Sequence, residues 1–326
     1  MRENTGTRGP QAAEATRGQA LGGDPDWAAM SDEELDAFRT KENARRSSPA
    51  MRAITGEPHP DAAIAWEQVA LPGRDLPVRV YRPSADQGRD LPLVLHVHGG
   101  GFVGTAVQCD WINSHMAAGL PAVVVSVEHR LLARDVGLEA AAEDGWDVLD
   151  HVVRNPARFG VDPARTVLMG ESTGGLISAL AAVRAREARI PLRAQVLVNP
   201  VTDVTESLFD YPSMTRYADS PTLSLPQMRL FRRLAVPPGA DARALSPLHA
   251  GDLAGLPPAL VLVPTEDPIA DQGRRYAERL REAGTAVRAV EYPGTGHAFL
   301  SMPGVVPAAE TARDDILHFL RDALAD

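Results

Sequence analysis

The segment Gly170-Glu171-Ser172-Thr173-Gly174-Gly175 constrains the fold more than any other part of this chain. It follows a short β-type run, residues 165–169, and precedes an Ala-rich, helix-like run without proline or glycine, residues 176–189. A G-x-S-x-G sequence between strand and helix is typical of a nucleophile elbow, a tight turn that lifts the serine hydroxyl clear of the sheet. The two outer glycines suit such a turn because a side chain there would collide with neighbouring backbone. The pattern predicts an exposed, strained Ser172 at a helix N-terminus, where backbone amides favour negative charge.

A second glycine motif, His98-Gly99-Gly100-Gly101-Phe102, follows the apolar run 93–97. Three consecutive glycines leave backbone N–H groups uncovered, so such a loop can approach a ligand and donate hydrogen bonds to an oxyanion. Either motif alone would also fit an ordinary flexible glycine loop. Two of them in this order, each at the end of an expected strand, predict a serine-hydrolase scaffold.

Strand-like runs alternate with helical stretches, which favours an α/β fold with a mostly parallel central sheet flanked by helices. The expected parallel strands are residues 93–97, 122–127, 166–169, 194–198, 259–263 and 287–292. Residues 66–71 and 78–81 are expected to form an antiparallel entry pair. With 326 residues and 44% hydrophobic content, the chain is long enough for one large α/β domain with a buried core.

A serine hydroxyl is a poor nucleophile near neutral pH, so a base must take its proton and an acid must orient that base. In folds with a nucleophile elbow the chain order is serine, acid, histidine. Three histidines follow Ser172, namely His249, His297 and His318. His318 lies in an amphipathic C-terminal stretch, and His249 lies in a turn well before the last strands. His297 follows the last expected strand and a Pro-Gly-Thr-Gly loop, so it is the expected base.

The acid is expected on the loop after strand 259–263, where Glu266, Asp267 and Asp271 compete. The proline after Asp267 biases that residue towards an extended backbone, which suits a loop position. Asp271 opens an expected helix, residues 274–282, and is better interpreted as a cap or a structural charge. Glu266 stays open as the alternative to Asp267.

These motifs resemble those of the bacterial hormone-sensitive-lipase-like esterases, an α/β-hydrolase family with His-Gly-Gly-Gly before a Gly-Asp/Glu-Ser-Ala-Gly-Gly elbow. The resemblance runs from about residue 60 to the C-terminus and implies an α/β-hydrolase fold with a small helical cap. The family's acid stands directly before a proline, so the resemblance assigns that role to Asp267. The implied reaction is hydrolysis of carboxylic esters of short to medium acyl chain, with Ser172, His297 and Asp267 forming the triad.

The same resemblance implies that the N–H groups of Gly100, Gly101 and Thr173 form the oxyanion hole. Two departures from the family pattern bear on the substrate. Thr173 stands where the family usually has alanine and adds bulk beside the acyl site. In residues 126–134, His129 replaces a tyrosine and the family's Ala-Pro-Glu turn is lost, although Glu128 keeps the acidic charge. His129 is interpreted as a structural histidine more readily than as a pocket residue.

Two other functions stay open. The changed segment 126–134 would suit the same scaffold acting as an acyltransferase, cyclase or dehydratase on a specialised metabolite. A non-catalytic ligand-binding module is less favoured because all three expected triad residues are present.

The sequence predicts a division of the chain into three parts. Residues 1–25 lack an apolar block and are expected to form a disordered tail. Residues 26–60 are expected to form an N-terminal helical cap segment, because residues 32–46 are polar and Ser31-Asp32-Glu33-Glu34 predicts a capping box. Residues 61–326 would form the hydrolase domain, with a cap insertion near 202–245. Cap side chains would line the acyl site or simply pack the helices, and the candidates are Trp27, Phe38, Tyr211, Met214, Tyr217 and Phe231.

Composition limits the partners. A net charge of −10 argues against nucleic acid and against anionic membrane surfaces, and no stretch reaches transmembrane length. No metal-ligand spacing such as H-E-x-x-H is present, so no metal and no other cofactor is expected, and the expected partner is a small-molecule ester. The single cysteine, Cys109, excludes an internal disulfide and suits a reducing, cytoplasmic compartment. The oligomeric state, a homodimer included, stays open.

Overall fold

The computed structural model describes residues 25–85 and 90–325 of the chain. Eight strands form one sheet in the order β1-β2-β4-β3-β5-β6-β7-β8, in which β1 pairs antiparallel with β2 and β2 with β4, and all later pairs are parallel. The strands are β1 (Ala62–Leu71), β2 (Arg74–Pro83), β3 (Leu91–Val97), β4 (Val123–Val127), β5 (Val161–Glu171), β6 (Ala194–Val198), β7 (Ala259–Pro264) and β8 (Val287–Tyr292). The predicted mostly parallel sheet and its antiparallel entry pair are confirmed.

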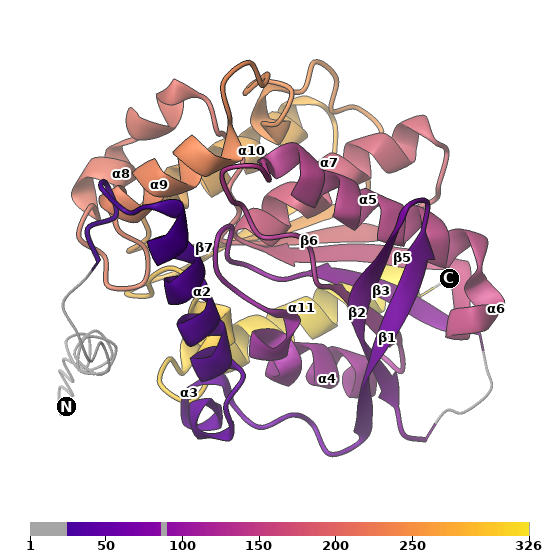
Figure 1. The fold of residues 1–326 in the computed structure, drawn as a ribbon. Helices are drawn as coiled ribbons and strands as arrows, with labels where there is room; N and C mark the ends of the chain where they lie inside the picture. The colour runs from indigo at the N-terminus through magenta and orange to yellow at the C-terminus, as the bar shows by residue number, and fades with distance from the viewer. Residues whose placement is uncertain (1–24, 86–89, 326) are drawn as a thin grey trace, which may run out of the picture.

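The central strands β3, β4, β6 and β7 are buried at every residue, which explains why each appears in the sequence as a mostly apolar run. Helices cover both faces of the sheet (Figure 1), with α4 and α11 on one face and α5, α7 and α10 on the other. Their bounds are α4 (Asp110–Gly119), α5 (Leu138–Arg154), α7 (Thr173–Glu187), α10 (Ala270–Glu282) and α11 (Ala308–Leu324), with the short α6 (Pro156–Phe159) after α5.

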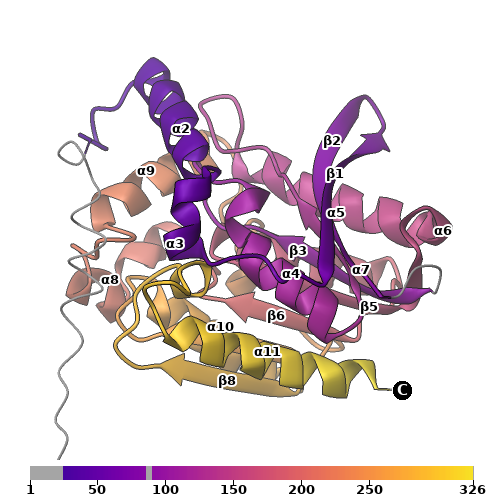
Figure 2. The same cartoon turned by 90° about the horizontal axis from the view of Figure 1, so that it is seen from below.

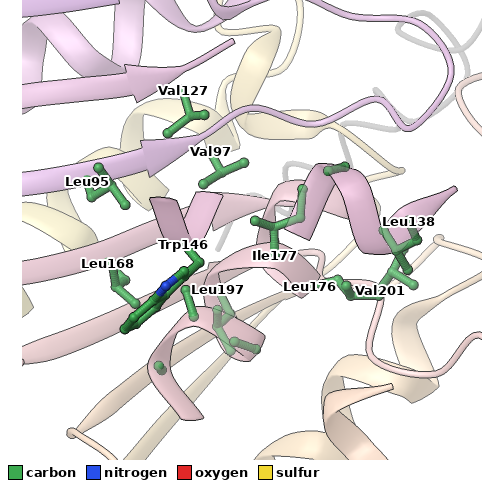
Figure 3. Close-up of a cluster of buried hydrophobic side chains, with 14 of the residues drawn as sticks. Leu95, Val97, Val127, Leu138, Trp146, Leu168, Leu176, Ile177, Leu197 and Val201 are labelled. Atoms are coloured by element: carbon green, nitrogen blue, oxygen red, sulfur yellow. The ribbon is translucent and has the colours of Figure 1, made fainter. Parts of the chain in front are cut away.

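The larger core lies between the sheet and the helices α5 and α7. Figure 3 shows Leu95, Leu168 and Leu197 from three parallel strands facing Trp146 of α5 and Ile177 of α7. All five side chains are buried. This packing holds α7 on one face of the sheet, and α7 begins directly after Ser172, at the carboxyl end of β5.

The N-terminal segment forms α2 (Asp32–Arg46) and the short α3 (Arg52–Thr55). The predicted capping box is present, since Ser31 Oγ accepts a hydrogen bond from Glu34 N and Ser31 N donates to Glu34 Oε2. Although the sequence of this segment is mostly polar, two of its apolar side chains are buried in the main core. Trp27 is 5% exposed and Leu35 is 3% exposed. The expected tail falls almost wholly on residues 1–24, which lie outside the described residues.

The insertion between β6 and β7 carries α8 (Pro212–Arg216) and α9 (Leu225–Ala235). Figures 1 and 2 both show α9 next to α2, and Arg233 Nη1 of α9 donates a hydrogen bond to Ala28 O at 3.1 Å. Most of the candidate cap side chains pack into the core. Trp27, Met214 and Phe231 are buried, and Phe38 and Tyr211 are partly buried against the same cluster.

Candidate active site

Ser172 occupies the turn between β5 and α7 with φ +55° and ψ −117°. This is a strained conformation for a residue with a side chain, as an elbow requires. A Cβ at Gly174 would overlap the carbonyl oxygen of Val97, and a Cβ at Gly170 would overlap the backbone of Gly174. The elbow can therefore form only with glycine at these two positions. One expectation was wrong: Ser172 is 8% exposed instead of open to solvent, because neighbouring segments cover it.

Ser172, His297 and Asp267 form one continuous hydrogen-bonded chain. His297 Nε2 lies 2.8 Å from Ser172 Oγ, and His297 Nδ1 lies 2.8 Å from Asp267 Oδ2. Asp267 is fully buried, and its Oδ1 accepts a hydrogen bond from Ile269 N at 3.0 Å. This second bond leaves Oδ2 directed at the imidazole, so the ring is held with Nδ1–H towards the acid and Nε2 free to accept the serine proton.

The competing residues lie elsewhere. Glu266 is exposed, and Asp271 accepts a hydrogen bond from a backbone amide of α8. His249 lies 3.3 Å from a different carboxylate, that of Asp203, and His318 is on the exposed side of α11. The structure thus brings together the three residues that the sequence favours, and within the described residues none of the alternatives hydrogen-bonds to Ser172 or His297 through its side chain.

Burial and charge act in opposite directions on the histidine. Burial lowers the pKa of His297, but the Asp267 carboxylate raises it by charge and by hydrogen bonding, and Glu171 adds to that effect. The net result is a pKa above the usual value. A neighbouring negative charge favours the imidazolium, which is the form that a histidine takes when it accepts a proton from a serine.

Sequence reasoning gave no role to Glu171, which precedes Ser172 and is 2% exposed. Ser301 Oγ donates a hydrogen bond to Glu171 Oε2 at 2.7 Å, and among the described residues Oε1 has no partner. Burial raises the pKa of Glu171, while the hydrogen bond from Ser301 and the charge of His297 act to lower it. The signal in the sequence is an acidic residue that follows directly on the apolar residues 167–170 at the end of β5.

The glycine loop, residues 98–104, lies beside the nucleophile. A Cβ on Gly99 would stand 3.4 Å from Ser172 Cβ, and a Cβ on Gly101 would stand 2.6 Å from the ring of Phe231, on α9. Gly100 has φ +99°, which glycine adopts readily and other residues rarely do. The loop that carries two of the expected oxyanion donors therefore borders Ser172, and the third, Thr173, is the first residue of α7.

Residues 126–134, which depart from the family pattern, pack beneath this loop. His129 is 3% exposed and stacks on His98 with ring centroids 4.3 Å apart. Burial lowers the pKa of both histidines to about 4, so both rings are neutral near pH 7. Glu128 Oε2 accepts a hydrogen bond from Ala106 N at 2.8 Å. These contacts favour the structural interpretation of His129.

Neither a metal centre nor a membrane span occurs in the described part of the chain. No cluster of three or more His, Cys, Asp or Glu side chains there is arranged to hold a metal ion. No helix within residues 25–85 and 90–325 has the length and apolar character needed to cross a membrane.

Comparison with known proteins identifies the family. The α/β-hydrolase fold family matches residues 94–301, so the chain belongs to that family, and the resemblance to bacterial esterases is confirmed. The chain is 38% identical over 275 residues to carboxylesterase NlhH of Mycobacterium tuberculosis, covering 81% of this chain and 84% of the relative. It is 34% identical over 285 residues to esterase LipI of the same species, covering 84% and 87%.

Solved structures agree with this assignment. The ester hydrolase EH1AB1 from the metagenome of Lake Arreo superimposes with a TM-score of 0.85 at 30% identity, covering 98% of this chain and 97% of that chain. The hyperthermophilic esterase from Pyrobaculum calidifontis has a TM-score of 0.85 at 28% identity, covering 97% and 99%.

Proposed function

We propose that this protein is a serine hydrolase that cleaves carboxylic esters of short to medium acyl chain through an acyl-enzyme on Ser172. The observation that carries the proposal is the hydrogen-bonded chain from Ser172 through His297 to Asp267, with 2.8 Å at each step. Relatives named as carboxylesterase, esterase and ethyl acetate hydrolase support the reaction type.

The first half-reaction follows from this arrangement. Ser172 Oγ attacks the ester carbonyl carbon while His297 Nε2 accepts the hydroxyl proton, and Asp267 stabilises the imidazolium that forms. The carbonyl oxygen becomes an oxyanion, which the N–H groups of Gly100, Gly101 and Thr173 bind. Each such donor contributes about 10²–10³ in rate.

The second half-reaction returns the enzyme to its starting state. The tetrahedral intermediate collapses and the alcohol departs with the proton from His297, which leaves the acyl group on Ser172. A water molecule then gives a proton to His297 and attacks the acyl carbon. Breakdown of that second intermediate releases the carboxylic acid and restores the Ser172 hydroxyl.

The proposal also covers the cap, the cellular compartment, the partners and the oligomeric state. Residues 26–60 and the insertion near 202–245 form the cap of the hydrolase domain, supported by the contact between α2 and α9. We place the protein in the cytoplasm and expect neither nucleic acid nor membrane as a partner, on the basis of the net charge of −10 and the single, buried Cys109. A homodimer is the alternative to a monomer, and analytical ultracentrifugation separates the two.

The test is Ser172→Ala assayed on p-nitrophenyl esters from acetate to decanoate. We expect kcat to fall by about 10⁶, as for the nucleophile of a comparable triad, while the melting temperature barely changes. Retention of a tenth of the wild-type rate would show that another residue is the nucleophile. Wild-type silence on every ester would favour the acyltransferase, cyclase or dehydratase instead.

A further inference from the structure

One face of α2 lies against the glycine loop. Arg39, Asn43 and Arg46 are four and three residues apart, so their side chains leave the same face of the helix. Each of the three side chains hydrogen-bonds either to the loop or to a residue that itself hydrogen-bonds to the loop. These contacts join segments about 60 residues apart in the sequence.

Asn43 holds the end of the loop. Its Oδ1 accepts a hydrogen bond from Gly104 N at 2.9 Å. Gly104 lies close to the start of the loop, since a Cβ on it would stand 2.6 Å from Gly99 O. The Asn43 side chain therefore fixes the point where the two ends of the loop approach each other.

Arg39 joins the loop to the segment beneath it. Its Nε donates to Phe102 O at 2.9 Å, and its Nη2 donates to Leu132 O at 2.7 Å. Leu132 N in turn donates to Gly101 O at 2.7 Å. The Arg39 side chain is 19% exposed, so water screens these charged hydrogen bonds only in part.

Arg46 acts on the loop through Gln108. Arg46 Nη1 donates to Gln108 Oε1 at 3.1 Å, and Gln108 Nε2 donates to Gly99 O at 3.1 Å. The planar trans peptide joins Gly99 C=O and Gly100 N–H in one rigid unit, with the two groups pointing in opposite directions. Holding the Gly99 carbonyl therefore also aims the Gly100 N–H.

We propose that α2 is a clamp on the oxyanion loop, with Arg39, Asn43 and Arg46 as positioning residues that preorganise the Gly100 and Gly101 amides. The proposal rests on the proposed ester hydrolysis. Donors that are already aimed at the position of the oxyanion need no reorganisation during the reaction, so loosening them weakens transition-state binding. A lid behaves differently, because loss of apolar contact with the acyl chain weakens binding of substrate and transition state alike.

The experiment compares Asn43→Ala with two matched variants. Asn43→Asp keeps an oxygen acceptor for Gly104 N, and Lys41→Ala changes an exposed residue of α2 for which no hydrogen bond or ion pair occurs within the described residues. Arg39→Met, which keeps an unbranched chain but loses both donors, is the second test of the clamp. For each variant we would measure kcat and KM on p-nitrophenyl acetate and octanoate, the melting temperature, and Ki for a trifluoromethyl ketone. That inhibitor adds to the nucleophilic serine and places an oxyanion in the hole.

We expect Asn43→Ala and Arg39→Met to lower kcat by about ten- to a hundredfold on both esters, with KM within about twofold of wild type. Ki for the ketone should rise by the same factor as kcat/KM falls. Asn43→Asp should recover most of the loss, and Lys41→Ala should match wild type throughout.

Three results would overturn the clamp. These are a kcat above half the wild-type value in both Asn43→Ala and Arg39→Met, a KM increase confined to octanoate, or a ketone Ki unchanged while kcat falls. Wild-type hydrolysis of p-nitrophenyl acetate, measured first, tests the proposed function separately, so the two failures are distinguishable.

Discussion

Asp271 Oδ2 accepts a hydrogen bond from the backbone N–H of Ser213 at 2.8 Å, so the acid four residues after Asp267 ties α8 to the first turn of α10. Ser213 Oγ returns a hydrogen bond to Pro268 O at 2.8 Å. Burial acts to raise the pKa of Asp271, but the hydrogen bonds from Ser213 and Arg274 outweigh it and lower that pKa. Asp271 therefore contacts α8, whereas Asp267, on the loop before α10, contacts His297.

Substituting each acid by its amide distinguishes an effect on catalysis from an effect on stability. We expect Asp267→Asn to lower kcat by about 10⁴, because an amide facing Nδ1 favours the wrong tautomer of His297. Asp271→Asn should keep most of kcat and lower stability by about 1–2 kcal/mol, since the change weakens a charged hydrogen bond. Ester kinetics of both variants measure the loss of kcat, and thermal unfolding measures the loss of stability. If Asp271→Asn were the slower enzyme, the assignment of the acid would be wrong.

The pH dependence follows from the environment of His297. The base must be neutral to accept the serine proton, so kcat/KM falls as pH decreases through the pKa of His297 in the free enzyme. Because the net effect of its neighbours raises that pKa above 6.5, the acid limb should lie above pH 6.5. Glu171→Gln removes a charge that contributes to the increase, so its acid limb should move to lower pH. A limb that stays in place or moves up would show that Glu171 does not act on His297.

The elbow glycine should be intolerant of a methyl group. Gly174→Ala places a Cβ on the carbonyl oxygen of Val97, which is backbone at the end of β3 and cannot rotate away. We expect a loss of more than about 3 kcal/mol or insoluble protein, since overpacking alone costs about 1–3 kcal/mol. Gly251→Ala is the control, because a Cβ there meets nothing within 4 Å. Equal urea midpoints for the two variants would contradict the close approach of Gly174 to the end of β3.

We expect Asp144 to stabilise the fold through its ion pair with Arg130, which lies in segment 126–134. Its side chain is fully buried and accepts hydrogen bonds from Arg130 Nε and Nη2, both at 2.9 Å, and from Arg74 Nη2 at 3.0 Å. Asp144→Ala should cost about 2–3 kcal/mol, below the range for fully buried pairs because both arginines keep contact with water. The exposed pair of Asp150 with Arg154 gives the control, and Asp150→Ala should cost less than about 1 kcal/mol. Thermal unfolding measures both, and similar losses would show that Asp144 is not specially important.

Local patterns determined much of this protein. The strand, the G-x-S-x-G turn and the Ala-rich run around Ser172 are adjacent in the chain, so steric and hydrogen-bonding preferences within a few residues are enough to predict the elbow. The alternation of apolar and helical segments likewise predicts the parallel sheet. The carboxyl ends of parallel strands meet at one edge, so placing Asp267 after β7 and His297 after β8 predicts that they lie near Ser172.

Contacts between distant segments were decided only by the tertiary structure. Leu35 is buried although its helix is mostly polar, and Ser172 is covered although its turn projects from the sheet. Nothing near Asn43 in the sequence indicates that its side chain accepts a hydrogen bond from Gly104 N. A side chain's burial and partners depend on which helix packs over which loop, and that is set by the free energy of the whole fold and not by the neighbouring residues.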